Sequence, residues 1–75
     1  MKKNDFQQIA ANLKATRLQF GFSQEDVAKK LNVSQSYVSR CETGGRRINV
    51  FDLERFADLY EKSISDLLTT KDEER

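Results

Sequence analysis

Glycine and proline, the residues that most often interrupt a helix, are scarce in this chain of 75 residues. Proline is absent, and the three glycines stand at positions 21, 44 and 45. Between these positions apolar residues return every three or four residues, and no useful stretch alternates apolar with polar residues. The sequence therefore predicts an all-α fold whose helices are separated at the glycines and at a few polar turns.

Helix starts are indicated by residues that can cap free backbone amides. The first helix is predicted over about residues 5–20, with Asn4 and Gln7 placed like a cap and its partner. Four later caps are Ser23, Ser34, Asn49 and Ser63. They predict helices over about 24–31, 35–43 and 50–61, and a short fifth helix after Ser63. Asn32 tolerates the left-handed conformation that a tight turn between helices often needs.

The chemistry open to the chain is limited by its single cysteine, Cys41, and its lack of histidine. No disulfide can form within the chain, and the usual acid–base, nucleophilic and zinc chemistries lack their commonest residues. We therefore expect no enzyme, no cofactor and no metal site. No apolar run approaches the roughly 20 residues of a membrane span, and the polar start is unlike a signal peptide. We expect a cytoplasmic chain with no membrane partner.

Residues 23–43 contain two predicted helices of eight or nine residues joined by a short turn. This is the smallest arrangement in which one helix braces another in the major groove of DNA. The strings SQEDVAKKL at 23–31 and VSQSYVSR at 33–40, followed by Glu42 and Gly44, resemble the Xre family of lambda-repressor and Cro-like regulators. The likeness covers about residues 6–68. It departs at Asn32, where glycine is usual, and at Cys41, where a larger aliphatic residue is common.

The resemblance implies a compact five-helix lambda-repressor-like DNA-binding domain with a helix-turn-helix at its second and third helices. We expect an N-terminal extension at 1–4, the helix-turn-helix DNA-binding domain at 5–69 and a polar C-terminal tail at 70–75. The implied function is that of a sequence-specific double-stranded DNA-binding transcriptional regulator. As in that family, the chain would act as a dimer on a near-palindromic operator, most plausibly as a repressor.

Charge is distributed unevenly behind the net value of +1. Residues 1–23 carry four basic and one acidic side chain, residues 24–49 carry five and three, and residues 50–75 carry four and eight. Lysine and arginine bind DNA by replacing the counterions of its phosphates. We therefore expect the acidic last third to face away from DNA.

Three side chains of the third predicted helix are candidates for reading bases. The Gln35 amide can pair with the N6 and N7 edge of adenine, although a solvated polar residue would look the same in sequence. Arg40 can reach guanine O6 and N7, clamp a phosphate or pair with a neighbouring acid. Ser36 can meet a base edge or a phosphate through water, or be a simple surface serine.

Five further side chains are candidates for phosphate contacts: Gln24, Tyr37, Ser39, Arg46 and Arg47. Gln24 begins the second helix, where amides and the helix dipole favour an anion, and in related proteins it also steadies the glutamine that opens the third helix. Tyr37 can instead pack at the core edge. Arg46 and Arg47 follow two glycines, which let the backbone approach a DNA strand, or they form a merely soluble loop.

Other residues of this region are expected to be structural. Val38 and Cys41 lie three residues apart and should point inward, which makes Cys41 a small core residue, with a redox sensor as the alternative. The family resemblance implies an ion pair between Arg17 and Glu42.

Partners beyond double-stranded DNA are indicated less directly. Apolar residues that seem to exceed the needs of a small core predict a homodimer through the fourth and fifth helices: Phe51, Leu59, Tyr60, Ile64 and Leu68. A regulatory protein partner could supply a signal, because there is no room for an effector domain. The acidic 50–75 segment also permits an alternative, an antitoxin or adaptor-type protein-interaction module on the same fold.

Overall fold

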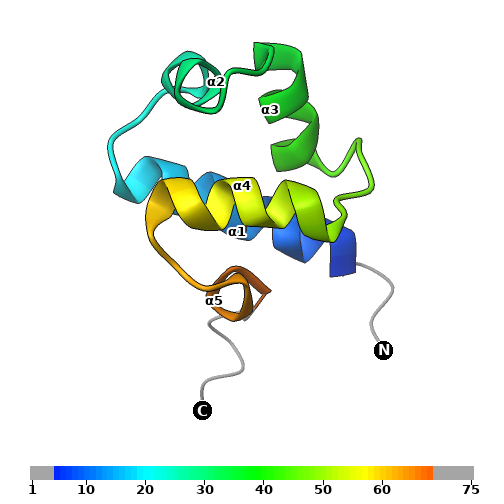
Figure 1. Ribbon diagram of the computed structural model, residues 1–75. Helices are drawn as coiled ribbons and strands as arrows, with labels where there is room; N and C mark the ends of the chain where they lie inside the picture. The colour runs from blue at the N-terminus through cyan, green and yellow to red at the C-terminus, as the bar shows by residue number, and fades with distance from the viewer. Residues whose placement is uncertain (1–4, 69–75) are drawn as a thin grey trace.

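The computed structural model describes residues 5–68, which form five helices and no strand (Figure 1). Their bounds are α1 Asp5–Gln19, α2 Gln24–Leu31, α3 Gln35–Thr43, α4 Val50–Tyr60 and α5 Ile64–Leu68. The all-α prediction is confirmed, and the first and fourth helices each end one residue earlier than expected. The predicted extension at 1–4, which includes the Asn4 cap, and the predicted tail at 70–75 lie outside the described residues.

The later helices begin where a side chain can satisfy the first free backbone amides. At α2 the Asp26 amide donates to Ser23 Oγ over 3.0 Å, and the Ser23 amide donates to the Asp26 carboxylate over 2.9 Å. A side-chain oxygen likewise accepts from a backbone amide three residues on at the other predicted caps, Ser34, Asn49 and Ser63. Local capping therefore explains why these helices start where the sequence predicts.

The helices are arranged around one apolar centre. In Figure 1, α2 and α3 lie at the top, α1 and α4 run across the middle and α5 lies below. Every helix contributes a fully buried side chain to this centre: Leu13, Val27, Val38, Cys41, Phe56, Tyr60 and Leu67. Because α3 packs against both α1 and α2, its position is determined by the core.

One part of the dimer prediction needs correction. Tyr60 is only 1% exposed and belongs to the core, so it is not surplus apolar surface. Leu59 and Ile64 are half-buried against the same core. Phe51 at 68% and Leu68 at 44% exposure are the members of the predicted set that stay open to solvent. Helical spacing could not separate Tyr60 from them, because Phe20 and Phe22 of the α1–α2 connection cover its ring.

Within residues 5–68, no helix combines the length and the apolar character needed to cross a membrane.

Candidate nucleic-acid interface

The third helix has one buried side and one exposed side. Val38 and Cys41 are completely buried, as predicted, and they anchor α3 to the core. Burial raises the pKa of the Cys41 thiol to about 11, so the thiol stays protonated near neutral pH and is a poor redox sensor. Gln35, Ser36 and Arg40 are exposed. The three candidate base-reading side chains therefore share the free side of one helix.

The turn between α2 and α3 sets the angle at which α3 is presented. Asn32 has the left-handed conformation expected of it, with φ 60° and ψ 47°. Its backbone N–H donates to the Lys29 carbonyl over 3.2 Å, and the Val33 N–H donates to the Ala28 carbonyl over 2.9 Å. These bonds satisfy the last carbonyls of α2 and turn the chain directly into α3.

A buried ion pair holds the far end of α3. The Arg17 Nε–H donates to both Glu42 carboxylate oxygens, over 2.9 and 3.1 Å, and the two side chains are 9% and 1% exposed. The second guanidinium group contact runs from Arg17 Nη1 to the Phe22 carbonyl over 2.8 Å. Arg17 thereby ties α1 to the end of α3 and to the segment that precedes α2.

Gln24 joins this ion pair to the exposed side of α3. Its Nε2 donates to Glu42 Oε1 over 3.2 Å, and its Oε1 accepts from Gln35 Nε2 over 3.4 Å. Gln24 is half-buried and Gln35 is exposed. The amide of Gln24 is therefore engaged within the protein on both of its ends, and a phosphate contact would have to use its second N–H.

Asp52 is the centre of a second polar cluster, which links α4 to α3. It is only 4% exposed and accepts from the Tyr37 hydroxyl and from Arg46, whose Nε and Nη2 lie 3.2 and 3.1 Å from its two oxygens. Burial raises the pKa of Asp52, but hydrogen bonds from Tyr37, the Asn49 amide and Arg46 outweigh it, so that pKa lies below its ordinary value. Asp52 is therefore ionised near neutral pH.

This cluster changes what two candidate phosphate ligands have available. The only hydroxyl hydrogen of Tyr37 is donated to Asp52, and its ring stacks on Phe56 at a centroid distance of 6.4 Å. Tyr37 thus has the core-edge position that the alternative interpretation described. The Arg46 guanidinium is held by Asp52 and lies 5.0 Å from the Tyr37 ring centroid. Arg46 is oriented in advance, with its side chain 37% exposed.

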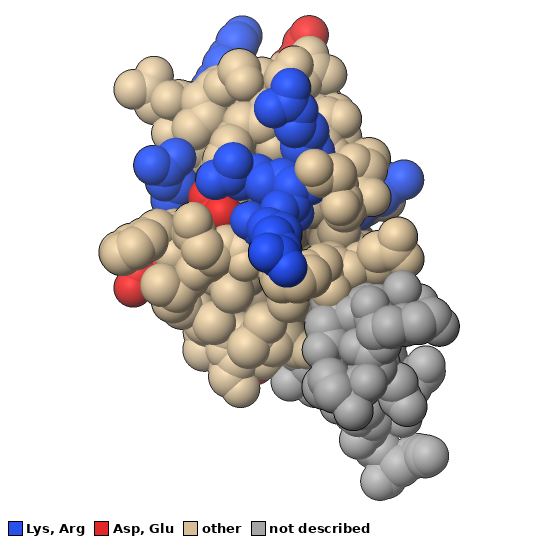
Figure 2. Space-filling view, turned by 90° about the vertical axis from the view of Figure 1, so that its right-hand side faces the viewer, with Lys and Arg blue, Asp and Glu red and all other residues tan. Residues whose placement is uncertain are grey.

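Basic side chains gather on the face of the molecule that carries α3 and the loop after it. Figure 2 shows lysine and arginine side chains clustered there around an acidic one. Arg47 is exposed, with its guanidinium 5.5 Å from the Phe6 ring centroid, and Ser39 is half-buried on α3. We call this surface, formed by Arg40, Arg46, Arg47 and Arg55 beside α3, the basic face.

Arg55 and Asp52 are the residues of this face that the sequence prediction missed. Arg55 lies 5.8 Å from the Tyr37 ring centroid although it belongs to the acidic last third of the chain. Asp52 was identified only as the partner of the Asn49 cap. A signal existed, because Asp52 and Arg55 stand three residues apart and so share one side of α4. What the sequence lacked was the packing of that side against Tyr37.

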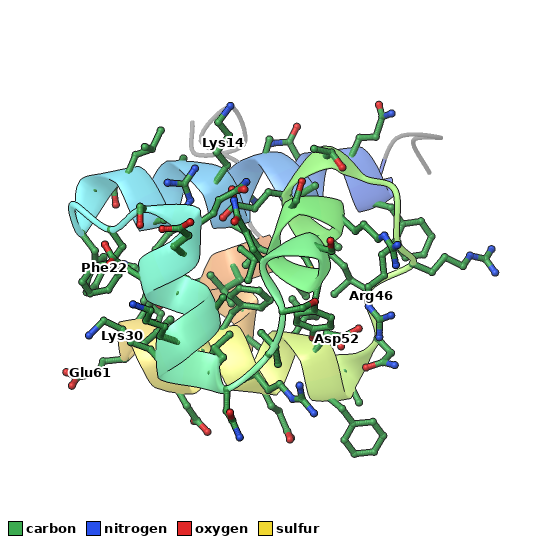
Figure 3. All side chains as sticks on the ribbon, turned by 90° about the horizontal axis from the view of Figure 1, so that it is seen from above. Lys14, Phe22, Lys30, Arg46, Asp52 and Glu61 are labelled. Atoms are coloured by element: carbon green, nitrogen blue, oxygen red, sulfur yellow. The ribbon has the colours of Figure 1, made fainter. Side chains whose placement is uncertain are left out.

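The labelled side chains in Figure 3 give the orientation of the basic face. Arg46 and Asp52 point toward one another at one end of α4, and Lys14 projects from α1 on another side of the molecule. Residues 5–68 contain no group of three or more histidine, cysteine, aspartate or glutamate side chains arranged to hold a metal ion.

Known proteins with this arrangement bind DNA. A helix-turn-helix family model matches residues 13–67, and the chain belongs to this family, the Xre and lambda-repressor-like helix-turn-helix proteins of transcription regulation. Among curated proteins, no sequence matches the chain closely enough to count as a relative.

Solved structures share the whole fold. The DNA-binding domain of BldD is 31% identical, covers 92% of this chain and 100% of its own, and has a TM-score of 0.81. The restriction-modification controller protein C.AhdI from Aeromonas hydrophila is 25% identical over 84% of this chain and 96% of its own, with a TM-score of 0.78. The hypothetical transcription factor NHTF from Neisseria is 26% identical over 97% and 85%, with a TM-score of 0.85.

Proposed function

We propose that this chain recognises a specific sequence of double-stranded DNA by placing α3 in the major groove, and that it represses transcription by occupying its operator. The observation that carries the proposal is the exposed polar side of α3 bordered by the basic face. The major groove admits one α-helix, and each base pair presents a distinct pattern of donors and acceptors there. A helix with a polar free side and a buried apolar side is suited to that groove.

Base contacts in this proposal come from the free side of α3. Gln35 opens the helix and reads adenine, and Arg40, five residues further on, reads guanine or clamps a phosphate. Ser36 lies next to Gln35 and contacts a base or a bridging water. All three are exposed, so DNA contact would not require the core to open.

Phosphate contacts in this proposal come from the ends of the helix pair. Arg47, Arg46 and Ser39 flank α3, and Gln24 offers an N–H at the start of α2. Tyr37 takes an indirect part, because its hydroxyl hydrogen is held by Asp52 while its ring supports Arg46. The contribution of Tyr37 is thus to orient a guanidinium group toward the phosphates.

We further propose that two copies bind together. The exposed Phe51 and Leu68 give apolar surface for a symmetric contact between copies. A two-fold dimer would read two half-sites about 34 Å apart on a near-palindromic operator. The chain would act in the cytoplasm without a cofactor, and a signal would come from a regulatory protein partner or from its own concentration.

The alternative is a protein-interaction module of the antitoxin or adaptor type. The feature that permits it is a set of exposed acids on α4, α5 and the turns beside them: Glu54, Asp58, Glu61 and Asp66. Likeness to a DNA-binding domain and to a restriction-modification controller supports the DNA-binding proposal instead.

Selection of duplexes from a random DNA pool tests the proposal. The chain should enrich one near-palindromic sequence, and affinity should fall steeply with salt, with a log–log slope of about −0.9 for each phosphate neutralised. Arg47→Ala should weaken all duplexes alike and make that slope shallower by about 1, whereas Lys14→Ala, on another side of the molecule, should change neither. Failure to enrich any duplex at low salt would favour the adaptor instead.

A further inference from the structure

Three polar links in series connect the buried ion pair to the exposed side of α3. Arg17 of α1 holds Glu42, Glu42 accepts from Gln24 of α2, and Gln24 accepts from Gln35. The donor–acceptor distances lengthen outward, from 2.9 Å through 3.2 Å to 3.4 Å. The outermost link is therefore the weakest in the free protein, where water competes for it.

The direction of this series is set at its buried end. An ionised carboxylate can only accept hydrogen bonds, and Glu42, 1% exposed and paired with Arg17, is held in that state. Gln24 must therefore turn its amide nitrogen toward Glu42, because its oxygen would face another acceptor. The Gln24 oxygen then points away from Glu42, and Gln35 can complete the link only by donating. Neither amide is free to turn around.

This orientation leaves Gln35 with a defined pattern of hydrogen-bonding groups. One of its two N–H groups is donated to Gln24, so one N–H and the carbonyl oxygen remain. Adenine presents an acceptor at N7 and a donor at N6, which match one donor and one acceptor. Guanine presents two acceptors, N7 and O6, and would need both N–H groups.

We propose that Glu42, acting through Gln24, is a positioning residue that sets the base preference of the chain, making Gln35 accept adenine and reject guanine. This inference rests on the proposed function and goes beyond it, because it assigns a part of base selection to a buried side chain that touches no base.

The test uses the duplex that the unmodified chain selects from a random pool. Gln35→Ala first identifies the base pair at which discrimination depends on Gln35. The affinity ratio for adenine over guanine at that position is then measured for the unmodified chain and for Gln24→Met, which keeps the side-chain length but removes both hydrogen bonds. We expect a preference on the order of tenfold in the unmodified chain, within the range of one bidentate base contact, and a ratio near one in Gln24→Met.

Two controls separate orientation from general weakening. Arg47→Ala should lower the affinity for both duplexes while leaving the ratio unchanged, because a phosphate contact carries no sequence information. Glu42→Gln replaces an obligate acceptor with an amide that can turn, so it should lower the ratio as Gln24→Met does. The double variant should lose no more than Gln24→Met alone, because both changes break one series.

A readout without DNA keeps the inference testable if Glu42→Gln does not fold. The two side-chain N–H resonances of Gln35 should be distinct in NMR spectra of the unmodified chain and should move toward the values of a free glutamine in Gln24→Met. An unchanged adenine-to-guanine ratio in a folded Gln24→Met would overturn the inference while the proposed function stands. A selected base other than adenine opposite Gln35 would also overturn it, and enrichment of no duplex would overturn both.

Discussion

Removing the Glu42 carboxylate should destabilise the fold itself. In Glu42→Ala the Arg17 guanidinium, 9% exposed, would keep its bond to the Phe22 carbonyl and lose both bonds to the carboxylate. Breaking one side of a buried pair costs roughly 3–5 kcal/mol, because an uncompensated charge is left behind. The surviving carbonyl contact places our expectation at the lower end, about 3 kcal/mol.

That loss is large for a chain of this size. At roughly 0.05–0.15 kcal/mol per residue, 75 residues have a free energy of unfolding of about 4–11 kcal/mol. For a domain of 60–100 residues, about 1 kcal/mol shifts the melting midpoint by roughly 4–8 °C. Glu42→Ala should therefore melt at least about 12 °C below the unmodified chain, measured by circular dichroism at 222 nm, about the usual helix wavelength.

Two matched variants make the measurement specific. Glu54→Ala removes an exposed acid and should stay within about 0.5 kcal/mol of the unmodified chain. Replacing Arg17 and Glu42 together with leucine should cost less than Glu42→Ala, since no charge is then buried alone. An unchanged midpoint in Glu42→Ala, accompanied by lost DNA binding, would refute the reasoning and show that the pair serves DNA contact alone.

Three further changes have definite expected outcomes. Tyr60→Phe should raise the urea midpoint, by up to about 1 kcal/mol in unfolding free energy, because the buried Tyr60 hydroxyl has no hydrogen-bond partner among the described residues; a clear loss would reveal a hidden partner. Asp52 has a pKa below its ordinary value when folded, so its stabilising contribution is present above about pH 4 and is lost as the pH falls through the folded pKa; Asp52→Asn should flatten that acid limb of the stability–pH curve, and an unchanged limb would assign it to other acids. Glu61→Gly should stabilise by about 0.5–1 kcal/mol, because Glu61 has φ 57° and glycine adopts this conformation without strain; an equal or lower melting midpoint would contradict the argument.

The helices were predictable because their boundaries depend on short-range chemistry. Ser23 with Asp26, and Asn49 with Asp52, each act within three residues, so the sequence displays them directly. The left-handed turn at Asn32 is equally local. These features need no knowledge of how the helices pack.

The polar clusters were less predictable because their members meet only after packing. Tyr37 and Asp52 are 15 residues apart, and their hydrogen bond exists because α4 crosses beneath the end of α3. The same contact places Arg55 beside Tyr37 and hides an acid within the basic face. The Arg17–Glu42 pair, 25 residues apart, was expected only through family resemblance. Periodicity assigned Tyr60 to an apolar side, but could not say that aromatic rings would cover it.

Asp52 has a consequence for how long the chain would dwell on unrelated DNA. Its negative charge lies within the basic face and cancels part of the attraction that Arg46 exerts on any phosphate. The same carboxylate holds that guanidinium in one orientation before DNA arrives, which lowers the entropy lost on ordered contact. Residence at random sites depends on charge, whereas residence at the correct site depends also on fit. An acid among the arginines therefore shortens the first more than the second.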